Sequence, residues 1–199
     1  MKSDLPRMTR EEYLEFEERS EEKHEWHDGL VIPVHQEVVG MSGGTFEHAM
    51  LVHNVGGELR SRLGDGRCVS LGSEMKLWSA ERRKHVYPDA SAYCGEPEFE
   101  VVAEKKLALL NPTLVVEVLS ASTENYDRGD KFALYRSIAS FREYVLINQE
   151  RARVETFFRT DDGNWKIETF DGLDAVVPLH SVGIELPLAE IYRNVRLPE

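Results

Sequence analysis

The sequence has few cysteines and no long apolar run. Its 199 residues include two cysteines, Cys68 and Cys94, which form no CxxC pair, and this argues against a structural zinc site. The sequence alone leaves a disulfide between them open. No stretch approaches the roughly 18 apolar residues of a membrane helix, and residues 1–4 begin no apolar signal segment. We therefore expect a soluble cytoplasmic protein with no membrane partner and with reduced thiols.

Basic residues are also scarce. The chain has 24 lysines and arginines against 36 aspartates and glutamates, a net charge of -12. This balance argues against a protein that holds nucleic acid through its overall charge. The nearest basic runs, at 82–85 and 105–106, are typical of solvated loop ends. The sequence contains no GxGxxG or GxxxxGK[ST] phosphate loop and no recognisable helix-turn-helix or zinc finger. Any DNA binding would be weak and salt-sensitive, and would depend on a local groove and Mg²⁺.

The length and the 41% hydrophobic content predict one domain over residues 1–199. An acidic helix at about 9–20 starts the chain, with Thr9 and Glu12 as its capping box, and the part at about 143–195 is rich in strands. The pattern predicts an α/β or α+β fold with a mixed sheet and a crossover helix after its central strand. The other expected helices cover 47–63, 123–138 (capped by Ser122 or Thr123) and 188–193, and the expected strands cover 30–32, 67–71, 74–78, 85–93, 113–119, 143–148, 153–159, 165–170 and 175–177.

The most informative residue is Glu117, which interrupts the apolar run 114–119 of the predicted central strand. A carboxylate inside a buried strand is costly unless a cation or hydrogen-bond donors satisfy it. A structural salt bridge or an edge-strand position would explain it without any function. Function is favoured, because a buried carboxylate is also what a metal site needs.

Asp89 and Lys131 are the two residues that complete a chemical pattern with Glu117. Asp89 follows Pro88, which cannot donate a ladder hydrogen bond, so this strand is expected at a sheet edge or bulged; by itself Asp89 is equally well a turn former. Lys131 shares a helix face with Asp127 and Tyr135, and this places it toward the sheet. It would either pair with Asp127 or lean over the end of the Glu117 strand.

Two strand carboxylates and an adjacent ammonium favour metal-assisted hydrolysis of a phosphodiester. Mg²⁺ binds one or two carboxylates and keeps water as its remaining ligands. A bound metal makes its water more acidic and stabilises the charge that develops on the phosphate. A neighbouring lysine can orient that water or neutralise the transition state. The pattern therefore predicts Asp89, Glu117 and Lys131 as catalytic residues with Mg²⁺, or Mn²⁺ in its place.

Several segments resemble the Uma-type restriction endonuclease family of the PD-(D/E)XK nuclease superfamily, over roughly residues 8–195. The resemblance implies a restriction-endonuclease-like core, a mixed central β-sheet flanked by helices, and Mg²⁺-dependent cleavage of double-stranded DNA by a homodimer. It also implies that Asp89, Glu117 and the backbone carbonyl of Val118 hold the metal. The matching segments are Pro88-Asp89, residues 111–120, Ser122-Thr123, residues 126–131 and residues 142–144, with Asp28-Gly29, His48 and residues 72–76 also similar.

One position departs from the superfamily pattern. Its usual lysine lies two residues after the glutamate, where this chain has Leu119, and the resemblance implies that Lys131 on the following helix takes over. The superfamily often places an acidic residue in the second helix, where this chain has Glu47 and His48 as accessory candidates. A histidine at a helix terminus is more often a structural hydrogen bonder.

Other conspicuous residues have simpler explanations. A surface ion pair accounts for Glu74 and Lys76, which share a strand face, and Trp26, Trp78 and Trp165 are expected to pack in the core or in loops. Two other functions stay open. One is a nuclease fold without catalysis that acts as a binding or regulatory module, and the other is a phosphodiesterase for small substrates, which needs no basic groove.

Overall fold

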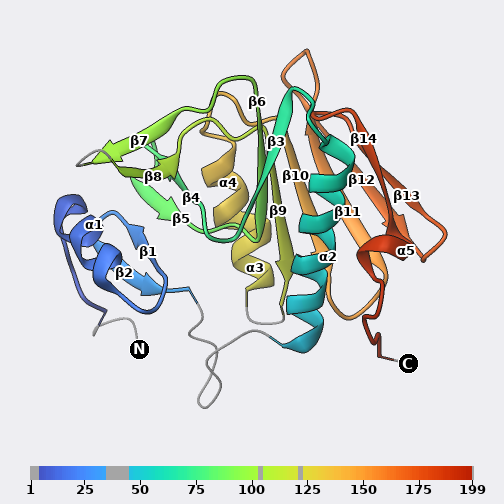
Figure 1. The fold of residues 1–199 in the computed structure, drawn as a ribbon, viewed down its shortest axis with the longest axis horizontal. Helices are drawn as coiled ribbons and strands as arrows, with labels where there is room; N and C mark the ends of the chain where they lie inside the picture. The colour runs from blue at the N-terminus through green and yellow to red at the C-terminus, as the bar shows by residue number, and fades with distance from the viewer. Residues whose placement is uncertain (1–4, 35–44, 103–104, 121–122, 199) are drawn as a thin grey trace.

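The computed structural model describes residues 5–34, 45–102, 105–120 and 123–198, and it folds them into mixed sheets with helices packed beside them (Figure 1). The fold is therefore of the mixed α+β kind that the sequence predicts. The helices are α1 (Arg10–Arg19), α2 (Phe46–Leu63), α3 (Glu124–Tyr126), α4 (Phe132–Tyr135) and α5 (Leu188–Ile191), with a π-helical segment, η1 (Asp127–Lys131), between α3 and α4. The strands are β1 (His24–His27), β2 (Leu30–Pro33), β3 (Cys68–Gly72), β4 (Lys76–Ser79), β5 (Lys84–Val86), β6 (Ala90–Cys94), β7 (Phe99–Val102), β8 (Lys105–Leu109), β9 (Leu114–Leu119), β10 (Glu143–Asn148), β11 (Arg153–Arg159), β12 (Trp165–Asp171), β13 (Val176–Leu179) and β14 (Ile184–Pro187).

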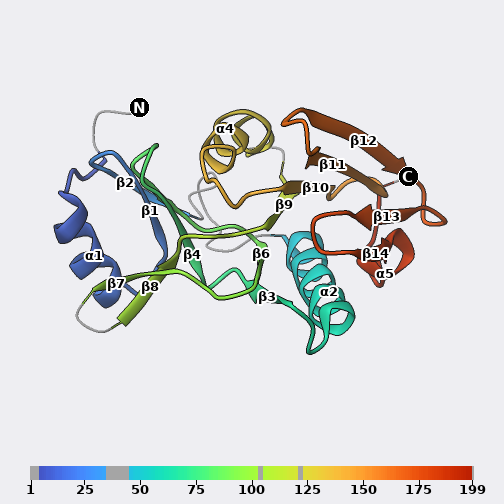
Figure 2. The same cartoon turned by 90° about the horizontal axis from the view of Figure 1, so that it is seen from above.

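One six-stranded sheet has the strand order β12-β11-β10-β9-β6-β3 and carries β9 near its middle. All six residues of β9 are buried, as expected for an apolar strand covered on both faces. Its side chains alternate between two cores: Val116 and Val118 pack with α2, whereas Val115 and Leu119 pack with α4. Figure 2 shows α2 and α4 on opposite sides of this sheet. The crossover from β9 to the parallel strand β10 runs through α3, η1 and α4, as predicted.

The second sheet has the order β2-β1-β5-β4-β8-β7 and packs against α1. The predicted capping box starts α1, because the Thr9 hydroxyl accepts from the Glu12 N–H while the Glu12 carboxylate accepts from the Thr9 N–H. The predicted turn joins β1 to β2, and Asp28 (φ 45°) and Gly29 (φ 99°) both take the left-handed backbone of a tight hairpin. The sequence does not predict strand β1, because its residues are mostly polar and show no strand-like hydrophobic pattern.

The expected strand over 85–93 is wrong in one respect. The chain forms β5 in one sheet, leaves it at Tyr87, and enters β6 in the other sheet at Ala90. Pro88 lies at the break, where its missing N–H breaks no ladder. The consequence is that Asp89 stands directly before β6, at the junction of the two sheets.

The helix predicted over 123–138 is also altered, because η1 interrupts it. Ser122 lies outside the described residues, and Thr123 precedes α3 without a side-chain capping bond. A π-helical turn admits an extra residue and is frequent at functional sites. Here it contains both Asp127 and Lys131, which are buried.

The expectation of reduced thiols is wrong for this structure, because Cys68 and Cys94 form a disulfide. The two residues are directly opposite each other in the antiparallel pair β3–β6, which brings the sulfur atoms together although 26 positions separate the residues in sequence. Across the described ranges, no helix has the length and apolar character needed to span a membrane.

Candidate active site

Glu117 lies in β9, and Asp89 lies directly before β6, the strand that pairs with β9 in the antiparallel sense. The register pairs Ala90 of β6 with Val116 of β9, and one further step brings Asp89 opposite Glu117. The Val118 N–H donates to Asp89 Oδ2 at 2.7 Å, which fixes the Asp89 carboxylate against the β9 backbone. The Asp89 charge also acts on the Glu117 carboxyl group, so the two side chains lie near each other.

Glu117 is 3% exposed and faces the α4 side of the sheet. The Tyr135 hydroxyl donates to its Oε1 at 2.7 Å, and the Lys131 ammonium lies 3.0 Å from its Oε2. Burial raises the pKa of Glu117 well above its usual value, although the Lys131 charge acts in the opposite direction. Such a strongly perturbed carboxyl group is typical of functional sites.

Lys131 satisfies both of the roles that the sequence left open. Its ammonium is 3.0 Å from Glu117 and 3.1 Å from Oδ1 of Asp127, and it lies over the ring of Tyr126 at 5.6 Å. Burial acts to lower the pKa of Lys131, but the charges of Glu117 and Asp127 outweigh it and the pKa is raised well above its usual value. Lys131 is thus a buried cation between two carboxylates.

His48 reaches the site and Glu47 does not. His48 Nε2 lies 3.4 Å from Asp89 Oδ1, and the two side chains are 21% and 19% exposed, which makes this the open side of the site. Burial acts to raise the pKa of Asp89, but the hydrogen bond and charge of His48, followed by Lys131, lower it. Among the described residues, no hydrogen bond or ion pair joins Glu47 to Asp89 or Glu117.

Sequence reasoning missed Glu25, which the structure brings to the same site from β1. Glu25 is 6% exposed. It accepts a hydrogen bond from the Tyr126 hydroxyl at 3.2 Å and lies 2.8 Å from Nε2 of His27. In sequence Glu25 belongs to an acidic stretch that reads as solvent-exposed. The available signal was the Asp28-Gly29 turn, which implies a strand before it as well as after it.

The donor chemistry of this site fits a divalent metal ion. Four buried or partly buried carboxyl groups (Glu25, Asp89, Glu117 and Asp127) lie around one lysine, and they supply oxygen atoms of the kind that a divalent ion binds. Within the part of the chain that the structure describes, no three His, Cys, Asp or Glu side chains form a preassembled metal cage. Two carboxylates with water as the remaining ligands suit Mg²⁺, which seldom uses an all-protein cage. The role of the Val118 carbonyl stays a prediction.

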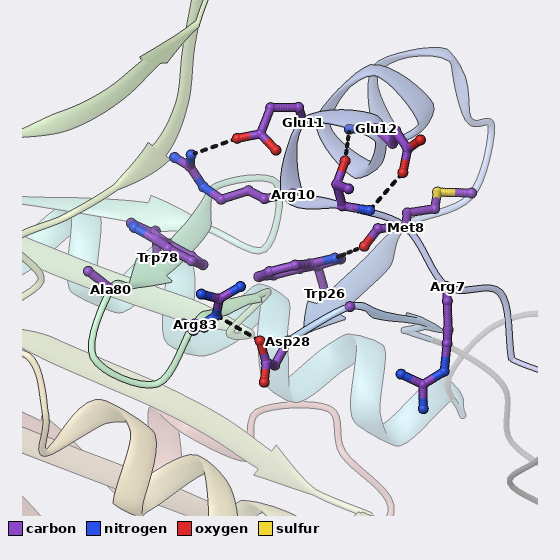
Figure 3. Close-up of a pocket in the computed structure, with 12 residues that line it drawn as sticks. Arg7, Met8, Arg10, Glu11, Glu12, Trp26, Asp28, Trp78, Ala80 and Arg83 are labelled. Carbon is purple, nitrogen blue, oxygen red and sulfur yellow. Dashed lines mark hydrogen bonds and ion pairs between the residues drawn. The ribbon is translucent and has the colours of Figure 1, made fainter.

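A separate hollow of about 820 Å³ lies on the face of β1 that carries Trp26, opposite the face that carries Glu25. It is bounded by the start of α1 and the β4–β5 turn (Figure 3). Trp26, Trp78 and Arg83 line it, and no predicted site residue does. Trp26 is buried and its Nε1 donates to the Met8 carbonyl at 3.0 Å. The expected packing role of Trp26 is therefore correct.

The expected surface ion pair of Glu74 and Lys76 is wrong. Glu74 pairs instead with Lys23 at 2.6 Å. Lys76 is 7% exposed, and its ammonium lies over the rings of Tyr13 and Tyr87 at 5.1 and 5.8 Å. The strand carries Lys76 into the interior, where aromatic faces replace a surface carboxylate as its partners.

Comparison with known proteins places this geometry in a family. Two proteins from Synechocystis are similar, both carrying the description "Uncharacterized protein": slr1290, 32% identical over 191 residues (96% of this chain and 94% of that protein), and sll1609, 34% identical over 170 residues (85% and 91%). A crystal structure from Anabaena variabilis, described as "a putative nuclease belonging to DUF820", matches with a TM-score of 0.69 and 18% identity, covering 93% of this chain and 97% of that one. At that identity the match shows the fold alone. The Uma2 family model, "Putative restriction endonuclease", matches residues 10–189, and the chain belongs to this family.

Proposed function

We propose that this protein is an Mg²⁺-dependent endonuclease that hydrolyses phosphodiester bonds in double-stranded DNA. One observation carries the proposal. The Lys131 ammonium lies 3.0 Å from the buried Glu117 carboxyl group in β9, and Asp89 lies directly before the neighbouring strand β6. Membership of the Uma2 family supports nuclease function in general. The metal and the DNA substrate are inferred from the chemistry of the carboxylates and the lysine.

Each residue has a distinct task in this proposal. Asp89 and Glu117 would hold the divalent ion, which when bound supplies Lewis-acid stabilisation and a more acidic water. The Val118 N–H keeps the Asp89 carboxylate in place, and the Tyr135 hydroxyl does the same for Glu117. Lys131 carries the positive charge that stabilises the negative charge developing on the phosphate in the transition state.

The substrate reaches this site from the side of Asp89 and His48, the more exposed pair. With a net charge of -12, the protein repels the DNA backbone at long range. We therefore expect weak, salt-sensitive DNA binding that strengthens with Mg²⁺. Cutting both strands of a duplex calls for two active sites, so the proposal includes a homodimer, which sedimentation analysis of the protein with and without DNA would test.

The test combines metal binding with cleavage. Isothermal titration with Mn²⁺ is expected to show uptake by the wild type and its loss in Asp89→Asn and Glu117→Gln. Plasmid cleavage with Mg²⁺ is expected only for the wild type. A matched control is Glu74→Gln, which removes an exposed carboxylate outside the site.

Three outcomes would contradict the proposal in different ways. Cleavage that survives both substitutions means that these carboxylates are not the catalytic ones. Metal uptake without cleavage of any substrate means a non-catalytic module. Turnover of bis(p-nitrophenyl) phosphate without plasmid cleavage means a phosphodiesterase for small substrates.

A further inference from the structure

Strand β1 brings a buried acidic group to the site from the second sheet. Glu117 lies in β9 and Asp89 directly precedes β6 of the same sheet, whereas β1 belongs to the other six-stranded sheet. The side chains of β1 alternate, so Trp26 faces α1 while Glu25 and His27 face the other way, toward α3. The Trp26 Nε1–H donates to the Met8 carbonyl (Figure 3). The Trp26 ring centroid lies 6.4 Å from that of Tyr13 and 6.1 Å from that of Trp78. The strand is therefore anchored on one face and presents Glu25 on the other.

Glu25 is surrounded by hydrogen-bond donors. Its Oε1 accepts from the Tyr87 N–H at 3.3 Å, and its Oε2 accepts from the Tyr126 hydroxyl at 3.2 Å. The same Oε2 lies 2.8 Å from Nε2 of His27, which must carry a hydrogen there because two lone pairs would repel. No ion pair to a lysine or arginine is present among the described residues around Glu25, so these donors, together with the charge of nearby Lys131, compensate its burial.

Tyr126 connects Glu25 to the catalytic lysine. Its hydroxyl is held by Glu25 and lies 3.2 Å from His27 Nε2, and the face of its ring is 5.6 Å from the Lys131 ammonium. Glu117 and Asp127 hold the same ammonium from other directions. The position of the Tyr126 ring therefore limits where the ammonium can lie.

We propose that Glu25 is a positioning residue that acts through Tyr126 to hold the Lys131 ammonium beside Glu117. This inference rests on the proposed nuclease function. A glutamine cannot replace Glu25, because an amide has one acceptor oxygen and Glu25 receives donors on both oxygens. Glu25→Gln therefore forces an N–H group against another donor while keeping the shape of the side chain.

The test measures kcat and KM for plasmid cleavage in Glu25→Gln, Tyr126→Phe and the double variant. Each single substitution is expected to lower kcat by about 10-fold to about 100-fold, the loss typical of a misplaced catalytic group, with KM unchanged within about twofold. Because both changes disrupt the same path, the kcat of the double variant is expected to be no lower than that of the more impaired single variant. Asp28→Asn is the control, since it changes an exposed pair with Arg83 in the same hairpin.

The outcomes separate this inference from the proposed function. A kcat for Glu25→Gln equal to that of the wild type, or losses that multiply in the double variant, would overturn it. If Glu25→Gln does not fold, Tyr126→Phe, which removes one oxygen atom, decides by the same kcat criterion. If the wild type cleaves no DNA, the proposed function fails, and a crystal structure of Tyr126→Phe decides instead: a displaced Lys131 ammonium supports the positioning role, and an unmoved one refutes it.

Discussion

The Lys131 ammonium lies 3.0 Å from Oε2 of Glu117 and 3.1 Å from Oδ1 of Asp127, so one buried cation serves two carboxylates. Removing one partner of a buried pair leaves an uncompensated charge, whereas an exposed pair contributes little. The stability of the protein and its proposed chemistry therefore depend on the same ammonium group.

Lys131→Met is expected to lower the free energy of unfolding by about 3–5 kcal/mol, because Glu117 and Asp127 lose their buried counterion. Adding Glu117→Gln should recover part of that loss without restoring cleavage. Urea denaturation measures both. Arg19→Met, which removes an exposed pair with Glu15, is the control and should cost less than about 1 kcal/mol. Wild-type stability in Lys131→Met would show that the buried pair does not stabilise the fold.

A lysine at position 119 would place an ammonium group on β9, where the superfamily pattern has its usual lysine. Leu119 lies two residues after Glu117 in β9, on the same face, and packs in the core beside α4. Lys131→Met is expected to lose cleavage, and adding Leu119→Lys to it is expected to restore cleavage to at least roughly tenfold above that background. Plasmid cleavage at equal concentrations of folded protein measures this. If no activity returns while the protein stays folded, the two lysine positions are not equivalent.

The disulfide joins β3 to β6 and closes a loop in the unfolded chain. For the sequence separation of 26 residues, the loss of chain entropy predicts a stabilisation of about 3.5 kcal/mol. We expect dithiothreitol or Cys68→Ser to lower the free energy of urea unfolding by that amount, and the variant to be insensitive to dithiothreitol. Protein purified without reductant and denatured should show no titratable thiol. Two titratable thiols would contradict the bond.

His85 makes stability depend on pH. Its Nε2 lies 2.6 Å from Glu100, and its buried Nδ1 has no hydrogen-bond partner among the described residues, so a second ring proton would have no acceptor. Burial lowers the pKa of His85 from 6.5 to about 3, with Lys76 and Arg10 adding to the effect. Below pH 6.5 His85 binds a proton in the unfolded chain but not in the folded protein. The free energy of unfolding therefore falls as the pH drops from about 6.5 toward about 3.

Replacing His85 should remove this contribution. His85→Gln is expected to flatten the dependence of the unfolding free energy on pH between about pH 6 and about pH 4 by about 1.4 kcal/mol per pH unit. Urea denaturation at a series of pH values gives the slope for both proteins. Equal slopes would show that His85 is protonated in the folded state.

The sequence predicts local patterns well and misses what depends on pairing between distant strands. The apolar run around Glu117 identified the central strand, whereas Pro88 indicated only an edge or a bulge where the chain in fact passes from one sheet to the other. The disulfide could not be predicted, since it depends on Cys68 and Cys94 meeting across β3 and β6. Glu25 was missed because the local sequence of a buried glutamate looks the same as that of an exposed one. Only the β1–β2 hairpin places its side chain in the interior.

The passage of the chain from β5 to β6 has a mechanical consequence. Glu117 belongs to β9, and Asp89 directly precedes β6 and accepts from the Val118 N–H, so their spacing follows the ladder between β6 and β9. Glu25 arrives from the other sheet. A small displacement of one sheet relative to the other would thus shift Glu25 and Tyr126 while leaving the two carboxylates at the same separation. The proposed binding of a metal ion and the proposed alignment of the lysine would therefore be separable, each governed by a different set of strands.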